Sequence, residues 1–533
     1  MTFIADQQDS PILEEHIGFT SKKDILGWYS CGFSNEVFSS VSITTFIPVL
    51  LEQLVRSSGV LLSDKSTPCL FHDSFFAFNL FRVDKKSNLC VIYIHGIGWI
   101  DSYSFSLYVY SIASFFQVIV IISISSLADY GKNRKMLFLV FSIIGGISSI
   151  SFIFINRRYL FASFLFVLSS MCFSASTVLL NAFLPGLCRN HPSVLKERKI
   201  LDSLWQSLSD DGFGKENVSK GNHIYRDYLK TYDLHISSLI SDLSSTFSSR
   251  GIAIGYLGAI IFQIVSIMII FVFGSGIKSF QIIICATGLW WLVFTIPVAL
   301  WLRSPLLPSL SKGILGNYPV IGYILYSWKS LIQTFLDIRK YKKIMLFLIA
   351  WFFISDAYSS ISSTTVLFVK STLHISPLGF IIITFLSTLF GVMGAFLWPY
   401  IARSLNFSLS QVLVFILFLS LFIPVYGILG LFPISLGLKR PIEIYILSMF
   451  FGFLYGGIQG YSRALFGKLC PENYETRFYA LYSITEKSSS FFGPALVGYI
   501  FHFTHNMRYS FFFLLMVMTI SIFILFRSKI SDK

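Results

Sequence analysis

The sequence predicts an all-α membrane protein of twelve transmembrane helices arranged in two six-helix pseudo-repeats. Composition, the spacing of long apolar runs and an internal repeat predict this class. Of the 533 residues, 54% are hydrophobic and only 13% are charged, and the mean hydropathy is +0.70. Soluble domains carry roughly 25% charged residues, so the composition excludes a soluble multidomain enzyme and a disordered scaffold. Seven cysteines in such a long chain also exclude a disulfide-stapled secreted module.

Twelve apolar runs are long enough to cross a bilayer, because a hydrocarbon core of about 30 Å needs roughly 20 helical residues. The first 24 residues are acidic and contain no short apolar core before a small-residue cleavage site, so we expect no cleavable signal peptide. The predicted spans are 25–50, 103–127, 136–155, 159–184, 252–274, 279–302, 344–369, 377–400, 410–431, 442–466, 478–501 and 509–527.

Polar segments between these spans define the expected domain organisation. The charged stretch at 185–250 predicts a flexible, solvated insertion, and residues 323–341 suit a helix on the membrane surface. We expect a cytosolic tail at 1–24, helices 1–4 within 25–184 with a luminal loop at 52–102, a cytosolic loop insertion at 185–250, helices 5–6 within 251–302, a central cytosolic linker at 303–343, helices 7–12 within 344–527 and a cytosolic tail at 528–533.

The distribution of Lys and Arg predicts the orientation of the chain. With both termini in the cytosol, 27 basic residues fall in inside segments and 12 in outside loops, as the positive-inside rule requires. The net charge of +14 is therefore mostly topogenic, and no nucleic-acid partner is expected. The glycosylation patterns at Asn217 and Asn406 fall on the cytosolic side and should be unmodified. Cys69 and Cys90 share the luminal loop, where they either pair or remain thiols.

An internal repeat relates the first span to the seventh. At an offset of 320, residues 35–45 align with 355–365 with five of eleven positions identical, and Glu36 falls over Asp356. A weaker match sets 181–188 over 463–470, linking the fourth span to the tenth. Both alignments pair span n with span n+6, which is the arrangement of two parallel six-helix repeats with substrate held between them. This arrangement resembles the major facilitator superfamily.

The loop between the second and third spans resembles a cytosolic loop of that superfamily. Its sequence runs from Leu127 through Asp129, Gly131 and Arg134 to Lys135. Gly131 permits a tight turn, and Asp129 can pair with Arg134 or Lys135 to hold one conformational state. The alternative is an ordinary basic turn. The corresponding stretch of the second half, 399–403, lacks the pattern, so a gating loop is expected in the first half only.

Ionisable side chains inside the spans are the candidate transport residues, because a charge at mid-membrane is costly and usually faces a bundle interior or an aqueous cavity. Glu36 and Asp356 lie near the middle of the first and seventh spans, and in the superfamily arrangement they would face each other's halves across the cavity. We expect them to bind a substrate ammonium or a coupling proton. Simple pairing with a neighbouring helix is the alternative.

Arg463 and Lys487 are the cations within the spans, and either could receive a substrate carboxylate. Arg463 could instead snorkel to the cytosolic interface. Lys487 and Glu486 are adjacent in sequence, so they should point to different helix faces and not neutralise each other. The polar candidates for the cavity wall, each of which could equally bridge helices, are Asn35, Gln117, Asn181 and Gln459.

Features of catalysis are scarce. His502 and His505 are spaced for metal ligation, but no third ligand is evident and interfacial histidines are the preferred interpretation. No P-loop or metalloprotease motif occurs, so we expect neither an enzyme, a metal nor a cofactor. The glycines at 251, 255 and 258 predict a smooth face for helix packing, and Gly493 followed by Pro494 predicts a bend.

Several segments together resemble the vacuole effluxer family, autophagy-related protein 22. The resemblance implies a fungal vacuolar membrane carrier that exports amino acids, leucine among them, to the cytosol after autophagic breakdown. It covers most of the chain and rests on residues 24–29, 35–38, 248–258, 290–297 and 491–496.

We therefore expect a vacuolar secondary transporter of neutral amino acids that is a monomer in the lipid bilayer. Protons are the candidate coupling ion. Two other classes remain open from the residues alone. One is a carrier of lipids or other organic solutes, although buried acids and bases suit an apolar cavity poorly. The other is a membrane receptor or scaffold that does not transport, for which mid-membrane acids would serve no purpose.

Overall fold

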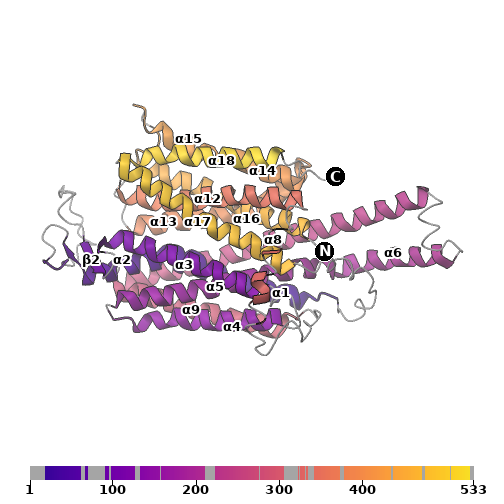
Figure 1. Ribbon diagram of the computed structural model, residues 1–533, viewed down its shortest axis with the longest axis horizontal. Helices are drawn as coiled ribbons and strands as arrows, with labels where there is room; N and C mark the ends of the chain where they lie inside the picture. Colours follow the sequence, from indigo (N-terminus) through magenta and orange to yellow (C-terminus); the bar gives the residue numbers. More distant parts are fainter. Residues whose placement is uncertain are drawn as a thin grey trace.

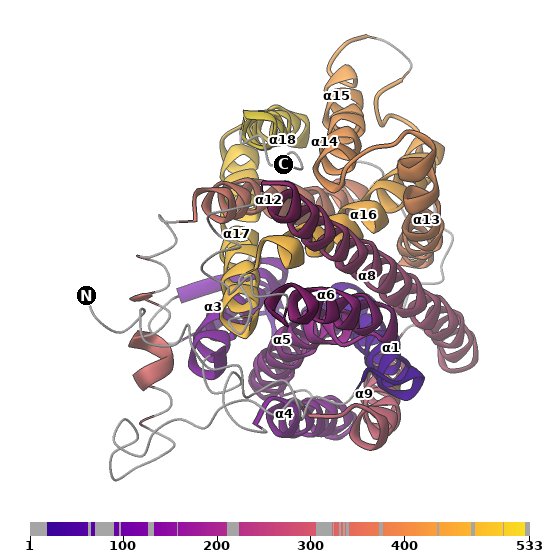
Figure 2. The ribbon, with the colours of Figure 1, turned by 90° about the vertical axis from the view of Figure 1, so that its right-hand side faces the viewer.

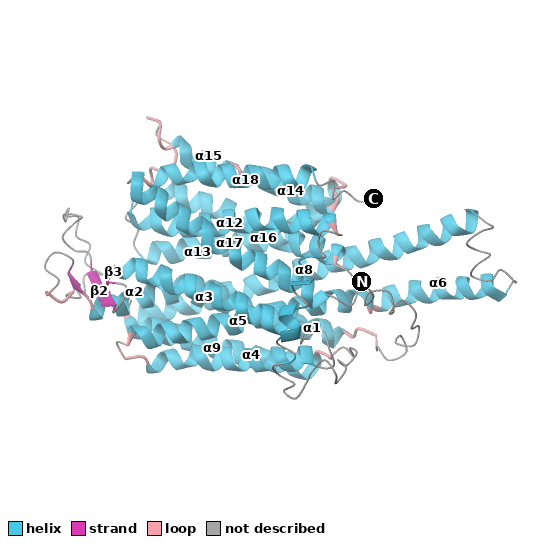
Figure 3. Cartoon of the chain, in the orientation of Figure 1, coloured by secondary structure: helices cyan, strands magenta, loops and turns pink. Residues whose placement is uncertain are grey.

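A computed structural model describes most of the chain. The described residues are 19–61, 66–69, 90–94, 98–125, 133–156, 158–210, 223–274, 276–304, 341–371, 377–433, 436–470, 475–504 and 506–527, with nine residues between 322 and 336. The protein is an elongated helical bundle (Figure 1), and Figure 3 shows how little of it is strand.

The first half begins with one continuous span that changes helix type twice. An α-helix gives way to a nine-residue π-helix, η2, and then returns to α. The elements of this half are α1 (Lys22–Val37), η2 (Phe38–Phe46), α2 (Ile47–Ser58), α3 (Ser102–Ser125), α4 (Asn133–Ile150), η4 (Ser151–Phe154), α5 (Tyr159–Arg189), α6 (Pro192–Asp210), α8 (His223–Phe273) and α9 (Ile277–Trp301).

The second half repeats the six-span pattern. Its elements are α12 (Lys342–Ser371), α13 (Pro377–Ser404), α14 (Leu409–Ser420), α15 (Phe422–Leu429), α16 (Pro441–Leu469), α17 (Glu475–Thr504), η6 (Met507–Tyr509) and α18 (Ser510–Arg527). Among the described residues, ten helices are long and apolar enough to cross a membrane. Helices α3 and α17 pack into the same bundle, so the architecture confirms the predicted class and is consistent with twelve spans.

The two halves lie side by side. Seen along the bundle, α1, α4, α5 and α9 gather on one side and α12 to α18 on the other (Figure 2). Helix α8 packs against α13 and α16, and α17 packs against α3 and α5. These four helix pairs form the contact between halves, and any site shared by the halves must lie among them.

Residues 185–250, predicted as a flexible insertion, contain helix instead. Helix α6 and the first part of α8 project from the bundle as a hairpin (Figure 1). The apolar residues Ile236, Ile240, Leu243 and Phe247 recur at spacings of four and three. Ile236 is buried, and the other three contact the first-half core. This helical period was hidden among the charges that suggested a loop. We call this end of the bundle the hairpin end.

A small antiparallel sheet marks the opposite end, the sheet end. Strands β1 (Val60–Leu61), β2 (Cys90–Ile94) and β3 (Gly98–Asp101) follow α2 and lead into α3, with Val60 opposite Val91 and Tyr93 opposite Trp99. Cys69 and Cys90 form a disulfide, which settles the alternative left open by the sequence. The strands themselves were not expected, because each is too short to give a clear alternating pattern.

The sheet end of the second half is fastened by Glu443 on α16, whose side chain is 8% exposed. Its carboxylate accepts hydrogen bonds from Tyr426 Oη (3.0 Å), Leu438 N (2.6 Å) and Arg440 N (3.1 Å). The guanidinium of Arg508, at the start of the last span, donates to the Leu438 carbonyl at 3.1 Å. An acceptor-only side chain therefore holds the loop before α16 in place.

We predict that Glu443→Gln lowers the stability of the folded protein by about 1–3 kcal/mol, because the new amide group faces backbone N–H donors that need an acceptor. The check is the melting temperature of the purified protein in detergent, with Asp202→Asn on exposed α6 as control. A Glu443→Gln protein that melts with the control would show that the hydrogen bonds contribute little.

Candidate functional site

Glu36 lies on α1 just before the π-helix and points into the bundle. Its Oε1 accepts a hydrogen bond from Ser40 Oγ at 2.9 Å. Helix α8 passes close beside it, since a Cβ placed at Gly255 would lie 3.0 Å from the Cβ of Glu36. Segments of π-helix occur often at functional sites, and here the segment begins two residues after the candidate acid.

The glycine face predicted on α8 is confirmed by its contacts with α1. A Cβ at Gly251 would lie 2.5 Å from the ring of Trp28, and a Cβ at Gly258 would lie 2.6 Å from the carbonyl oxygen of Phe33. Such distances leave no room for a side chain. Close packing of α8 on α1 thus fixes where Glu36 enters the bundle.

Arg463 approaches Glu36 from the other half. The Cα–Cβ bonds of a helix tilt toward its N-terminus, and α1 and α16 begin at opposite ends of the bundle. Glu36 consequently leans toward the hairpin end and Arg463 toward the sheet end, so the two side chains converge. Arg463 lies within electrostatic range of Glu36, Tyr256 and Tyr482. Between the two alternatives for Arg463, this geometry favours the interior over the membrane interface.

Glu486 and Lys487 on α17 complete the charged cluster. The expectation that they would not pair is wrong, because Lys487 Nζ lies 3.8 Å from Glu486 Oε1. Both are long side chains, Lys487 25% and Glu486 29% exposed, and they bend toward each other although their Cα atoms start on different faces. Glu486 is also in electrostatic range of Glu36. The cluster therefore joins one charged residue of the first half with three of the second.

Tyrosines surround the cluster, and the sequence reasoning missed them. Tyr455 forms a three-ring cluster with Tyr358 and Phe451, whose ring centroids lie 5.4 and 5.6 Å from its own. Its hydroxyl accepts a hydrogen bond from Gln459 Nε2 at 2.7 Å. Tyr482 stacks on Trp351 and precedes Glu486 by one helical turn. That spacing of four, which sets an aromatic ring and an acid on one helix face, was the usable signal.

Asp356, for which the sequence left open a place facing the cavity and pairing with a neighbouring helix, contacts α17. Its side chain is 4% exposed, and Oδ1 accepts a hydrogen bond from the backbone N–H of Gly493 on α17 at 2.7 Å. The shorter carboxylate thus lies between α12 and α17. Glu36, its counterpart in the repeat, extends one methylene further and reaches the bundle interior.

The four polar candidates were expected either to line the cavity or to bridge helices. Gln117 accepts a hydrogen bond from Ser174 Oγ at 2.7 Å and so bridges α3 and α5. Asn35 is buried beside Glu36, and neither of its amide atoms has a hydrogen-bond partner within the described ranges. Asn181 is buried in α5. Gln459 donates to the hydroxyl of Tyr455, one of the tyrosines around the charged cluster.

The gating loop is described only in part, because Asp129 and Gly131 lie outside the described residues. Arg134 at the start of α4 is 4% exposed, and its Nη1 donates to the carbonyl oxygen of Ala182 on α5 at 3.0 Å. Lys135 is partly buried and lies in electrostatic range of Asp24. These residues tie the hairpin ends of α4, α5 and α1 together within the first half.

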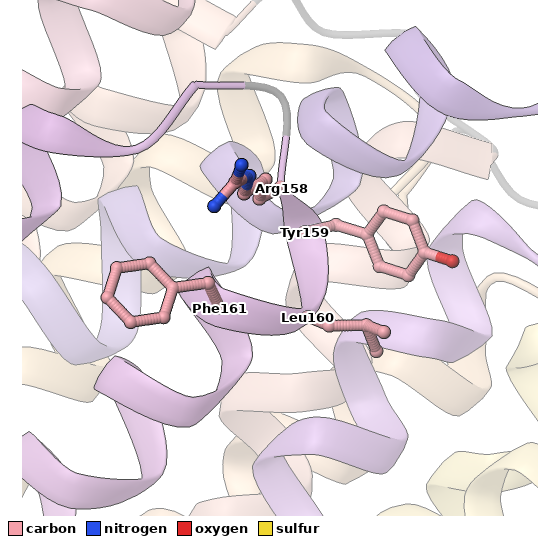
Figure 4. A pocket seen from close by; sticks show the side chains of 4 residues that line it. All are labelled: Arg158, Tyr159, Leu160 and Phe161. Carbon is pink, nitrogen blue, oxygen red and sulfur yellow. The ribbon is translucent and has the colours of Figure 1, made fainter.

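Neither a metal site nor the surface hollow competes with the cluster. The described residues contain no group of three side chains able to hold a metal ion, and His505 lies outside them. A hollow at the start of α5 is lined by four consecutive residues, 158–161 (Figure 4). Their side chains point in different directions, and Arg158 is the only charged one. A binding site would need several polar groups that converge.

Comparison with known proteins gives matches along nearly the whole chain. The family described as "Vacuole effluxer Atg22 like" matches residues 20–532. Autophagy-related protein 22-1 of Penicillium rubens is 40% identical over 93% of this chain and 88% of its own length. Autophagy-related protein 22 of Coccidioides immitis is 39% identical over 92% of this chain and 84% of its own length.

Solved structures of transporters share the fold. The human organic anion transporter MFSD10 superposes with a TM-score of 0.56 at 13% identity, covering 94% of this chain and 99% of its own. A bacterial homologue of the iron transporter ferroportin, in an outward-facing state, superposes with a TM-score of 0.53 at 11% sequence identity. The match covers 95% of this chain and 98% of the homologue. At such low identity these structures support the major facilitator fold and nothing narrower.

We predict that Gly258→Ala forces α1 and α8 apart and lowers stability by roughly 1–3 kcal/mol, since the added Cβ meets a backbone carbonyl that has little freedom to move. Thermal melting of the purified protein measures the effect. Gly186→Ala is the matched control, because a Cβ at that helical glycine meets nothing within 4 Å. Equal melting of the two variants would contradict the close-packing argument.

Proposed function

The chain belongs to the vacuole effluxer family of Atg22-like proteins, and we propose that it exports neutral amino acids, leucine among them, from the vacuole lumen to the cytosol. Family and fold make it a vacuolar membrane transporter. The substrate and the direction of transport are the parts of the proposal that need experiment.

The observation that carries the proposal is the pair of opposite charges offered by the two halves. Glu36 of the first half suits an ammonium group, and Arg463 of the second suits a carboxylate, which a guanidinium binds in bidentate fashion. No ion pair involving Arg463 is found within the described part of the chain. A free amino acid carries both charges, so one substrate molecule would bridge the halves.

Bridging the halves would also couple binding to the conformational change. On the hairpin side of Gly255, α8 and α16 are in contact, with Ser248 Oγ 3.5 Å from the carbonyl oxygen of Gly460. Substrate held between Glu36 and Arg463 would draw the other side of the cavity closed and favour release of this contact. We propose that the hairpin end, where α1 begins and α18 ends, faces the cytosol, in agreement with the distribution of basic residues.

Protons are the proposed coupling ion. Glu36 is the one charged residue that the first half contributes to the cluster. A proton on its carboxylate and a substrate ammonium would compete for the same oxygens. Loading from an acidic lumen and release toward a neutral cytosol would then follow from the occupancy of a single side chain.

We predict that Glu36→Gln and Arg463→Gln each reduce leucine transport by about tenfold or more, because each variant removes one charged contact worth roughly 1.5–3 kcal/mol. The double variant should lose little more than either single variant, since both residues hold the same molecule. Proteoliposomes with labelled leucine and an imposed proton gradient provide the measurement.

Asp202→Asn, on the exposed face of α6, is the control and should transport normally. Absence of leucine transport by the intact protein would overturn the proposed function. Normal transport by both single variants would leave the function standing and overturn the assignment of the two residues.

A further inference from the structure

The contact between α12 and α17 has an unusual polar composition. Besides the bond from Gly493 N–H to Asp356 Oδ1, the hydroxyl of Ser355 donates to the carbonyl oxygen of Glu486 at 3.3 Å. Two adjacent residues of α12 therefore bind α17 at points seven residues, or about two turns, apart. The hydroxyls of Ser489 and Ser490 converge on the same Glu486 oxygen, at 2.7 and 2.9 Å.

Glycine is needed at the second of these points. A Cβ placed at Gly493 would lie 1.7 Å from Ser360 Oγ and 2.5 Å from Asp356 Oδ1. Only a residue without a side chain allows the carboxylate to reach the helix backbone. The next residue, Pro494, has no N–H, so the helix is already short of a backbone hydrogen bond in this turn. In the same turn the Asp356 carboxylate accepts a hydrogen bond from the N–H of the preceding residue, Gly493.

Fastening α17 at this place fixes the charged part of the site. The fastened segment, 486–493, begins with Glu486 and Lys487, and Glu486 lies in electrostatic range of Glu36 and Tyr455. A shift of α17 relative to α12 would therefore move two of the four charges in the cluster. Asp356 is too deeply buried between the helices to contact a substrate in the cavity.

We propose that Asp356 is a positioning residue: its oxygen atom accepts the Gly493 N–H, and this bond holds the Glu486–Lys487 pair in its place opposite Glu36. An acceptor oxygen is what the position requires, and a negative charge is not. The inference rests on the proposed function only in its transport test, because the position of α17 can be measured without transport.

Asp356→Asn keeps an acceptor oxygen and removes the charge, whereas Asp356→Ala removes both. In leucine transport we expect Asp356→Asn to stay within about twofold of the unaltered protein, and Asp356→Ala to lose about tenfold, in line with one buried hydrogen bond. The dependence of transport on pH should be unchanged in Asp356→Asn and flattened in Glu36→Gln. If Asp356 carried the coupling proton itself, the pH profile would be flattened in Asp356→Asn as well.

A second readout follows α17 directly. Lys487→Cys, in a Cys470→Ser background that removes the partly exposed native thiol, reports access to the site through its rate of reaction with a thiol reagent in detergent. Adding Asp356→Asn should leave this rate within about twofold, and adding Asp356→Ala should change it by about fivefold or more, because local opening governs access.

Normal transport and labelling in Asp356→Ala would overturn the proposal. Loss of transport in Asp356→Asn equal to that in Glu36→Gln would also overturn it, because the charge would then matter. Should Asp356→Ala fail to reach the membrane, the asparagine variant decides alone on the same criteria. If the intact protein does not transport leucine, the proposed function fails, and the labelling rates still decide the role of Asp356.

Discussion

Burying charge inside a membrane bundle is the constraint on which the rest of this structure depends. Glu36, Arg463, Glu486 and Lys487 balance to zero net charge, and each is costly in hydrocarbon without its partners. The charges come from α1, α16 and α17, so neutrality is reached only when both halves are assembled. The close contacts of α8 with α1, and of α17 with α12, keep these helices at the spacing that the balance requires.

The aligned acids of the two halves, Glu36 and Asp356, have related but different surroundings. Glu36 and Asp356 occupy equivalent positions, each faces a glycine of a neighbouring helix, and each is followed four residues later by a serine. Ser40 donates to Glu36, whereas Ser360 Oγ has no hydrogen-bond partner among the described residues and lies against Gly493. One methylene separates a carboxylate that reaches the bundle interior from one that ends at a helix backbone. The two aligned acids thus have different surroundings in the two halves.

Most of the fold could be predicted from sequence, because spans of about 20 apolar residues are a strong signal. Glu36 and Arg463 could be singled out from the sequence because a charged side chain within a membrane span is energetically costly. The pairing of Glu486 with Lys487 was not predicted, and the surroundings of Asp356 were left open between a cavity and a neighbouring helix, since both depend on side-chain conformation and on which helix lies opposite. The hairpin was missed because its charges masked the helical spacing of Ile236, Ile240, Leu243 and Phe247.

Helix α8 runs without a break from His223 in the hairpin, past Gly255 beside Glu36, to Phe273 at the sheet end. From Gly255 to His223 the helix extends about 48 Å at 1.5 Å per residue. A tilt of about 10° at the glycine would thus carry the distal end of the arm through roughly 8 Å. A small change among the side chains around Gly255 would therefore produce a larger displacement at the far end of the hairpin.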